Sequence, residues 1–114
     1  MTVNYAELAL DSEGYLHSIS AWTPEVAEAL AAHEHRTLTP EHWDIINVVR
    51  QFYARFEMVP AMRPLVNAVR GELGEEKGSS MHLMSLFPEQ NGRQESPAKI
   101  VARLAGLPRP TNCH

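Results

Sequence analysis

Residues 39–57 read TPEHWDIINVVRQFYARFE and carry the clearest structural signal in the chain. Thr39 followed by Pro40 is a typical helix start, because a hydroxyl caps free N–H groups and proline suits the first helical position. Glu41 then suits the positive end of the helix dipole. The apolar spacing predicts one helix from Pro40 to about Glu57 with a single buried face. We expect the centre of the core to be formed by Ile45, Ile46, Val49, Phe52, Tyr53 and Phe56.

Similar signals predict four more helices. A hydroxyl residue followed by proline recurs at two further helix starts, a serine caps a third, and glycine or proline supplies the stops. The predicted helices run from Pro24 to about His33, from Met62 to Leu73, from Met81 to Phe87 and from Pro97 to Ala105.

The N-terminal part of the chain has a different pattern. Residues 3–8 roughly alternate apolar and polar side chains, residues 11–14 (DSEG) are turn-forming, and residues 15–19 (YLHSI) suit a return strand. The sequence therefore predicts a mainly α fold with a small N-terminal β-hairpin packed on the helices.

Composition limits the classes of function. A chain of 114 residues suits one domain, and its net charge of −4 argues against non-specific nucleic-acid binding as the main activity. There is no apolar run long enough to span a membrane and no visible secretory signal, so we expect a cytoplasmic protein. The single cysteine excludes an internal disulfide and a cysteine-rich metal site, and no cofactor is expected.

The C-terminal end reads LPRPTNCH over residues 107–114. Pro108 and Pro110 prevent a helix and favour an extended form. We therefore expect residues 1–106 to form one domain and residues 107–114 to form a flexible arm that holds Cys113 clear of it.

Cys113 is the strongest candidate for chemistry, because a thiolate is a sulfur nucleophile and an exposed thiol is usually avoided. Positive charge from Arg109 and His114 would favour the thiolate, whereas the terminal carboxylate would oppose it. A lone cysteine can hold an extra sulfur as a persulfide but cannot release it by forming an internal disulfide. No catalytic triad is recognisable, so a sulfur carrier fits better than a hydrolase.

Two weaker patterns stay open. Residues 33–35 (HEH) resemble a fragment of a metal site, but we expect solvated side chains at a helix end and no metal. Arg63, Asn67 and Arg70 share one helix face, which suits either a DNA-reading helix or a basic patch for a protein partner. We favour the protein partner over DNA.

The order of these motifs resembles the DsrC/TusE family over essentially the whole chain from about residue 10. The C-terminal pattern A-G-L-P-[KR]-P followed by a penultimate cysteine is the most specific. The matching segments are residues 11–16 (DSEGYL), 38–43 (LTPEHW), 48–53 (VVRQFY), 60–63 (PAMR), 78–88 (GSSMHLMSLFP) and 99–113 (KIVARLAGLPRPTNC).

The resemblance implies an orthogonal helical bundle with a helix-turn-helix-like core and an extended C-terminal arm. Dissimilatory members of the family carry a second cysteine eleven positions before the penultimate one, where this chain has Ala102. The chain is therefore similar to the single-cysteine, TusE-type branch.

That branch implies a sulfurtransferase, a persulfide carrier that acts within a relay. The resemblance implies that Cys113 takes sulfane sulfur from the TusD subunit of a TusBCD-type complex and delivers it to an MnmA-type tRNA thiouridylase for 2-thiolation of wobble uridine. The resemblance then implies that this chain contacts tRNA only indirectly, through the thiouridylase. Supporting partner contacts are expected, from charge alone, at Arg109, Lys99, Arg103 and Arg63.

Three other functions remain as alternatives: a single-cysteine DsrC-like paralogue in sulfur oxidation, a helix-turn-helix DNA-binding regulator, and a scaffold subunit of a larger sulfur enzyme.

Overall fold

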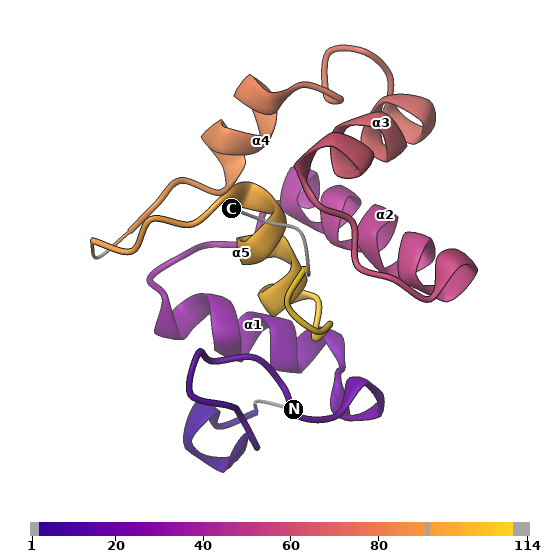
Figure 1. The fold of residues 1–114 in the computed structure, drawn as a ribbon. Coiled ribbons are helices and arrows are strands. Elements are labelled where there is room, and N and C mark those ends of the chain that lie inside the picture. Colours follow the sequence, from indigo (N-terminus) through magenta and orange to yellow (C-terminus); the bar gives the residue numbers. More distant parts are fainter. Residues whose placement is uncertain (1–2, 91, 111–114) are drawn as a thin grey trace.

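The computed structural model describes residues 3–90 and 92–110. Its helices and two 3₁₀ turns are shown in Figure 1. The predicted helices are confirmed, with each boundary within about one residue of its expected place. The elements are η1 (Tyr5–Glu7), η2 (Ile19–Ala21), α1 (Pro24–His33), α2 (Pro40–Phe56), α3 (Met62–Leu73), α4 (Ser80–Leu86) and α5 (Pro97–Leu104).

Helix α5 lies at the centre of the fold, between α1 on one side and α2 on the other (Figure 1). It packs against α1, α2 and α3, and every residue of it except Lys99 is buried. A helix that is buried on nearly all sides must be apolar on nearly all sides. The one charged residue among the buried ones, Arg103, therefore needs partners inside the protein.

Local capping explains why the helices begin where the sequence predicts. Thr23 Oγ1 accepts a hydrogen bond from the Val26 N–H at 3.2 Å, and Ser96 Oγ accepts one from the Lys99 N–H at 3.3 Å. Ser79 does the same at the start of α4. These bonds satisfy N–H groups that the first turn of a helix leaves unpaired.

The start of α2 is tied to the end of α4 by His42. The Thr39 N–H donates to Nδ1 of His42 at 3.1 Å, which leaves Nε2 to donate to the Leu86 carbonyl at 2.8 Å. The imidazole is only 9% exposed. One side chain thus caps α2 and fixes α4, a short helix, against the body.

The N-terminal β-hairpin is not confirmed. Only one antiparallel bridge, between Leu10 and Leu16, forms in the described residues, and residues 5–7 make a 3₁₀ turn instead of a strand. Asn4 Oδ1 accepts from the Ala6 N–H at 3.1 Å, so a local side-chain bond replaces the expected strand pairing. Asp11 Oδ1 likewise accepts from the Tyr15 N–H and closes a tight loop.

The expected core centre is right at one end of α2 and wrong at the other. Ile45, Ile46 and Val49 are fully buried, but Phe56 is 51% exposed. Arg50 of α2 donates a hydrogen bond to the Ala105 carbonyl at the end of α5. Phe56 lies almost two turns further along α2. The helix therefore runs past the element that covers it, and periodicity alone does not reveal where such cover stops.

No helix within residues 3–90 and 92–110 has the length and apolar character needed to cross a bilayer.

Candidate functional site

Cys113 and its neighbour His114 lie outside the described residues. The candidate site is therefore approached through residues 104–110, which we call the tail root because they are the described residues that lead to the cysteine.

The end of α5 is closed by a Schellman turn. Gly106 has φ of +73°, the Leu107 N–H donates to the Ala102 carbonyl at 3.0 Å, and the Gly106 N–H donates to the Arg103 carbonyl at 3.2 Å. Leu107 is 1% exposed and belongs to the core. The segment expected to be a free arm from residue 107 is thus anchored at its first residue; Pro108 and Arg109 are exposed, and Pro110 is buried again.

Two long side chains hold the first two carbonyls of the tail root. Trp22 Nε1 donates to the Leu104 carbonyl at 2.9 Å, and the Arg50 guanidinium donates to the Ala105 carbonyl at 2.6 Å. The same guanidinium lies 3.9 Å from the centroid of the Trp22 ring, which adds a cation–π contact. A Cβ at Gly106 would lie 2.4 Å from Cδ1 of Trp22, so only glycine fits beneath the indole.

Arg103 is enclosed by two carboxylates. It donates to Glu34 at 2.7 and 3.0 Å and to Glu95 at 2.6 and 3.0 Å, and its side chain is 2% exposed. Burial alone would raise the pKa of the Glu34 carboxyl, but the hydrogen bonds and charges of Arg103 and Arg36 hold it below its ordinary value. Burial disfavours the charge of Arg103, yet both glutamates together raise its pKa. The network ties the end of α1 and the loop before α5 to α5 itself.

The four predicted cations are in different environments. Arg103 is buried and has no surface to offer a partner, whereas Arg109 is exposed and paired with Glu13 on the N-terminal loop. Lys99 is partly exposed on α5, and its carbonyl accepts from the Tyr15 hydroxyl at 3.2 Å. Arg63 is exposed on α3, beside a groove.

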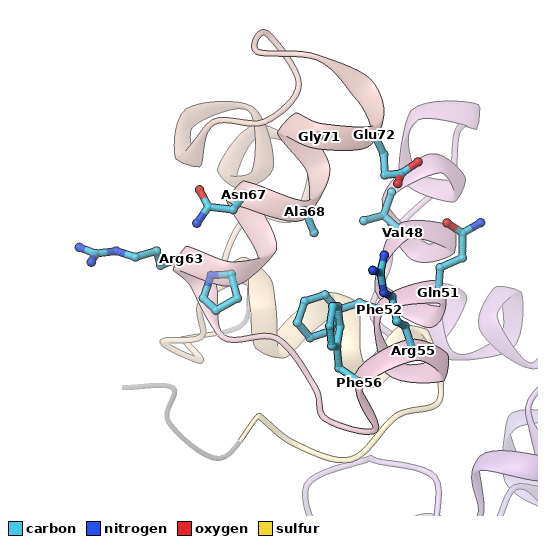
Figure 2. Close-up of a pocket in the computed structure, with 11 residues that line it drawn as sticks. Val48, Gln51, Phe52, Arg55, Phe56, Arg63, Asn67, Ala68, Gly71 and Glu72 are labelled. Carbon is cyan, nitrogen blue, oxygen red and sulfur yellow. The ribbon is translucent and has the colours of Figure 1, made fainter.

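This groove lies between α2 and α3 and has a volume of about 610 Å³ (Figure 2). Phe52 and Phe56 line it with ring centroids 4.7 Å apart, and the Arg55 guanidinium lies 5.2 Å from the centroid of Phe56. The remaining lining residues are Val48, Gln51, Arg63, Pro64, Asn67, Ala68, Gly71 and Glu72.

Sequence reasoning missed the partners of the tail root. Glu34 was expected to be solvated, but its side chain is only 15% exposed and is paired with both Arg103 and Arg36. Its neighbour His33 stacks on Tyr5 with ring centroids 3.7 Å apart. No group of three or more potential ligands in the described ranges is arranged to hold a metal ion. Trp22 is partly buried, and nothing in the local sequence signals its hydrogen bond to the Leu104 carbonyl.

Comparison with known proteins identifies the family. Residues 2–114 match the sequence family described as DsrC like protein. The chain belongs to the DsrC-like family. The resemblance seen in the motifs is therefore confirmed over nearly the full length.

Members of the DsrC-like family with curated names or solved structures agree in sequence and in fold. Sulfurtransferase TusE from Salmonella typhimurium is 44% identical over 107 residues, which cover 94% of this chain and 93% of that protein. DsrC from Allochromatium vinosum is 45% identical, with a TM-score of 0.83, and the match covers 100% of this chain and 96% of that one. The oxidized γ-subunit of the dissimilatory sulfite reductase (DsrC) from Archaeoglobus fulgidus is 36% identical, with a TM-score of 0.77, covering 94% and 92% of the two chains.

Proposed function

We propose that this DsrC-like chain is a sulfurtransferase that works as a sulfur carrier within a relay, not as a stand-alone enzyme. It accepts sulfane sulfur on Cys113 and passes it to a tRNA-thiolating enzyme for 2-thiolation of wobble uridine. The Salmonella typhimurium relative named Sulfurtransferase TusE, 44% identical across most of both chains, supports this assignment.

The anchored tail root is the observation that carries the proposal. Trp22, Arg50 and the Schellman turn fix the chain through Leu107, six residues before its only cysteine. Six extended residues span at most about 20 Å. A fixed root with a short reach suits a nucleophile that enters the active sites of other proteins, because little of the chain has to be ordered on binding.

The chemistry needs only thiols and persulfides. The Cys113 thiolate attacks the outer sulfur of a donor cysteine persulfide, a new S–S bond forms on Cys113, and the donor sulfur leaves as a thiolate. Cys113 then holds a persulfide. A thiolate of the acceptor attacks its outer sulfur in the same way, which returns the Cys113 thiolate without any net oxidant or reductant.

The partners form part of the proposal. The donor is a TusBCD-type complex acting through its TusD subunit, and the acceptor is an MnmA-type tRNA thiouridylase. The chain meets tRNA only through that enzyme, works in the cytoplasm and needs no membrane. Arg109 is exposed and Lys99 is partly exposed, which supports their proposed contacts with a partner, whereas we propose that buried Arg103 supports the site by fixing α5.

The second candidate is a single-cysteine DsrC-like paralogue in sulfur oxidation, kept because the chain is also 45% identical to a protein named DsrC, from Allochromatium vinosum. Identity does not separate the two branches, because the TusE relative is 44% identical. Position 102 argues against the two-cysteine dissimilatory type, since it holds a fully buried alanine where those members carry their second cysteine. This chain therefore has no cysteine pair to oxidise.

A DNA-binding role has less support. Arg63 and Asn67 are exposed on α3, but Arg70 donates to the Gly78 carbonyl at 3.1 Å and is committed to the following loop. The net charge of −4 also opposes binding to a phosphate backbone.

The test is intact-protein mass spectrometry after incubation with a cysteine desulfurase and cysteine, with and without the TusBCD-type complex. We expect an added sulfur mass that reductant removes and that Cys113→Ser lacks. Full sulfur transfer by a folded Cys113→Ser variant would refute the carrier mechanism. Absence of an adduct in both conditions, with active desulfurase, would favour the regulatory or scaffold alternatives.

A further inference from the structure

The groove between α2 and α3 presents an apolar surface that no described part of the chain covers. Its floor includes Phe52 and Phe56, which face the α3 wall in Figure 2. Phe56, at the end of the 17-residue helix α2, is 51% exposed, although phenylalanine is among the residues most often fully buried in proteins. A volume of about 610 Å³ falls within the usual range of about 300–1,000 Å³ for binding pockets and is large enough for more than one side chain.

The groove has two arginines near one end and a glutamate near the other. Arg63 stands near the start of α3 and Arg55 near the end of α2, so both cations lie toward the end where the two helices are joined. Glu72 stands near the end of α3, nine residues beyond Arg63, which is about 13 Å along a helix. Figure 2 shows Arg63 and Glu72 at different levels of the α3 wall.

Neither groove arginine forms an ion pair with another described residue. Among residues 3–90 and 92–110, the arginines in ion pairs are Arg36, Arg93, Arg103 and Arg109, not Arg55 or Arg63. In a chain whose net charge is −4, the unpaired Arg55 therefore lies over the half-exposed Phe56, and the unpaired Arg63 stands on the α3 wall of the groove. Carboxylates from outside would complement that end of the groove.

We propose that this groove binds an amphipathic helix of the partner protein that exchanges sulfur with Cys113. The helix places apolar side chains at i, i+3/i+4 and i+7 over Phe52 and Phe56, and acidic residues beside Arg55 and Arg63. This inference rests on the proposed carrier function and adds to it a docking surface distinct from the tail.

The position of the groove fits simultaneous contact with the tail. Arg50, which holds the Ala105 carbonyl, is on the same helix as Phe56 and six residues before it, about 9 Å along the axis. The tail reaches at most about 20 Å beyond Leu107. A partner seated on the groove is thus within reach of the cysteine-bearing end, and the linked contacts raise the effective concentration of the thiol at its target.

A protein helix suits the groove better than RNA. The apolar floor offers nothing to phosphates, and the Glu72 carboxylate at one end repels them. Isolated phenylalanines stack with bases, but base-stacking sites normally lie in a continuous basic groove. Binding of tRNA or of a second copy of the chain at this surface is treated as an outcome of the test.

The experiment measures binding of the purified TusBCD-type complex and of the purified MnmA-type enzyme by isothermal titration calorimetry. The chain carries Cys113→Ser throughout, so that no covalent sulfur exchange contributes. Groove variants are Phe56→Ala and Arg63→Glu. The matched control is Met84→Ala on α4, because Met84 is 52% exposed against 51% for Phe56 and does not line the groove.

We expect each groove variant to weaken binding of at least one partner on the order of tenfold or more, while Met84→Ala leaves it unchanged. Circular dichroism checks that each variant is folded. Equal affinity for groove and control variants would overturn the proposal. So would a lack of binding to both proteins, or a groove-dependent loss seen only for tRNA or only for self-association in sedimentation.

A separate readout keeps this result apart from the carrier function. Sulfur uptake by the unaltered chain from a low-molecular-weight persulfide, followed by mass spectrometry, tests Cys113 without any partner. Uptake there combined with unchanged binding in the groove variants would refute the docking surface alone. No uptake combined with groove-dependent binding would refute the carrier chemistry and leave a docking module.

Discussion

The tail root and the α2–α3 groove both combine arginine with aromatic side chains. They differ in whether the arginines have hydrogen-bond or ion-pair partners within the described chain. At the tail root, Arg50 lies over Trp22 and donates to the Ala105 carbonyl, and Arg103, the residue just before the tail root, is enclosed by Glu34 and Glu95. In the groove, Arg55 lies over an exposed phenylalanine and has no carboxylate partner among the described residues. In the first region the polar groups are paired within the chain, so this region anchors the start of the tail to the body. The second leaves apolar area and charge uncovered, so it is suited to bind.

The largest expected effect is on the Arg103 network. Arg103→Ala leaves two mostly buried carboxylates without their shared cation, which costs about 3–5 kcal/mol of unfolding free energy. The control is Arg93→Ala, which removes the partly exposed partner of the same Glu95 and costs about 0–1 kcal/mol. Urea unfolding measures both. Similar losses for the two variants would show that the tail root does not depend on the buried pair.

Gly106→Ala tests how closely the tail root is packed. The left-handed backbone costs about 1–2 kcal/mol for alanine, and the contact with Trp22 adds about 1–3 kcal/mol of overpacking. Gly92→Ala is the matched control, because Gly92 has φ of +74° against +73° but meets nothing within 4 Å. We expect thermal unfolding to show the backbone cost alone for the control. Equal shifts in melting temperature would mean that the indole moves aside freely.

Acid should weaken the Arg103 network beside the tail root. The pKa of Glu34 lies below its ordinary value of 4.5, so its stabilising contribution is present above pH 4.5 and is lost as pH falls through the lowered pKa. Glu34→Gln removes that dependence, and the stability of wild type and variant should converge as pH falls below 4.5, by at most about 1.4 kcal/mol per pH unit. Urea unfolding across this range measures it. Parallel pH profiles would contradict the ion pair.

The smallest expected effect on stability is in the groove. Phe56→Ala should change the unfolding free energy by about 0.5 kcal/mol or less, because half of the ring is already in water. Phe87→Ala, at a ring that is 1% exposed, should cost about 3–5 kcal/mol. Denaturant unfolding compares the pair. A large loss for Phe56→Ala would place that ring in the core after all and remove the contrast between the two regions.

The sequence by itself determined the helix boundaries and the family. Both depend on information that is local in the chain: a hydroxyl caps an N–H three residues away, glycine ends a helix at its own position, and family motifs are ordered strings. The N-terminal hairpin failed for a related reason. Alternating side chains over residues 3–8 suggest a strand, but side-chain bonds from Asn4 and Asp11 compete for the same backbone groups and form turns.

The tertiary structure alone decided which side chains hold the tail root and which surface is left open. The bonds Glu34–Arg103, Trp22–Leu104 and Arg50–Ala105 join residues 69, 82 and 55 positions apart. Helical periodicity assigned Phe56 to the same face as Ile45 and Val49, and the structure separated them by how far the covering helix extends. The reason is physical: periodicity specifies which face of a helix is apolar, whereas burial depends on what the rest of the chain places against each turn of that face.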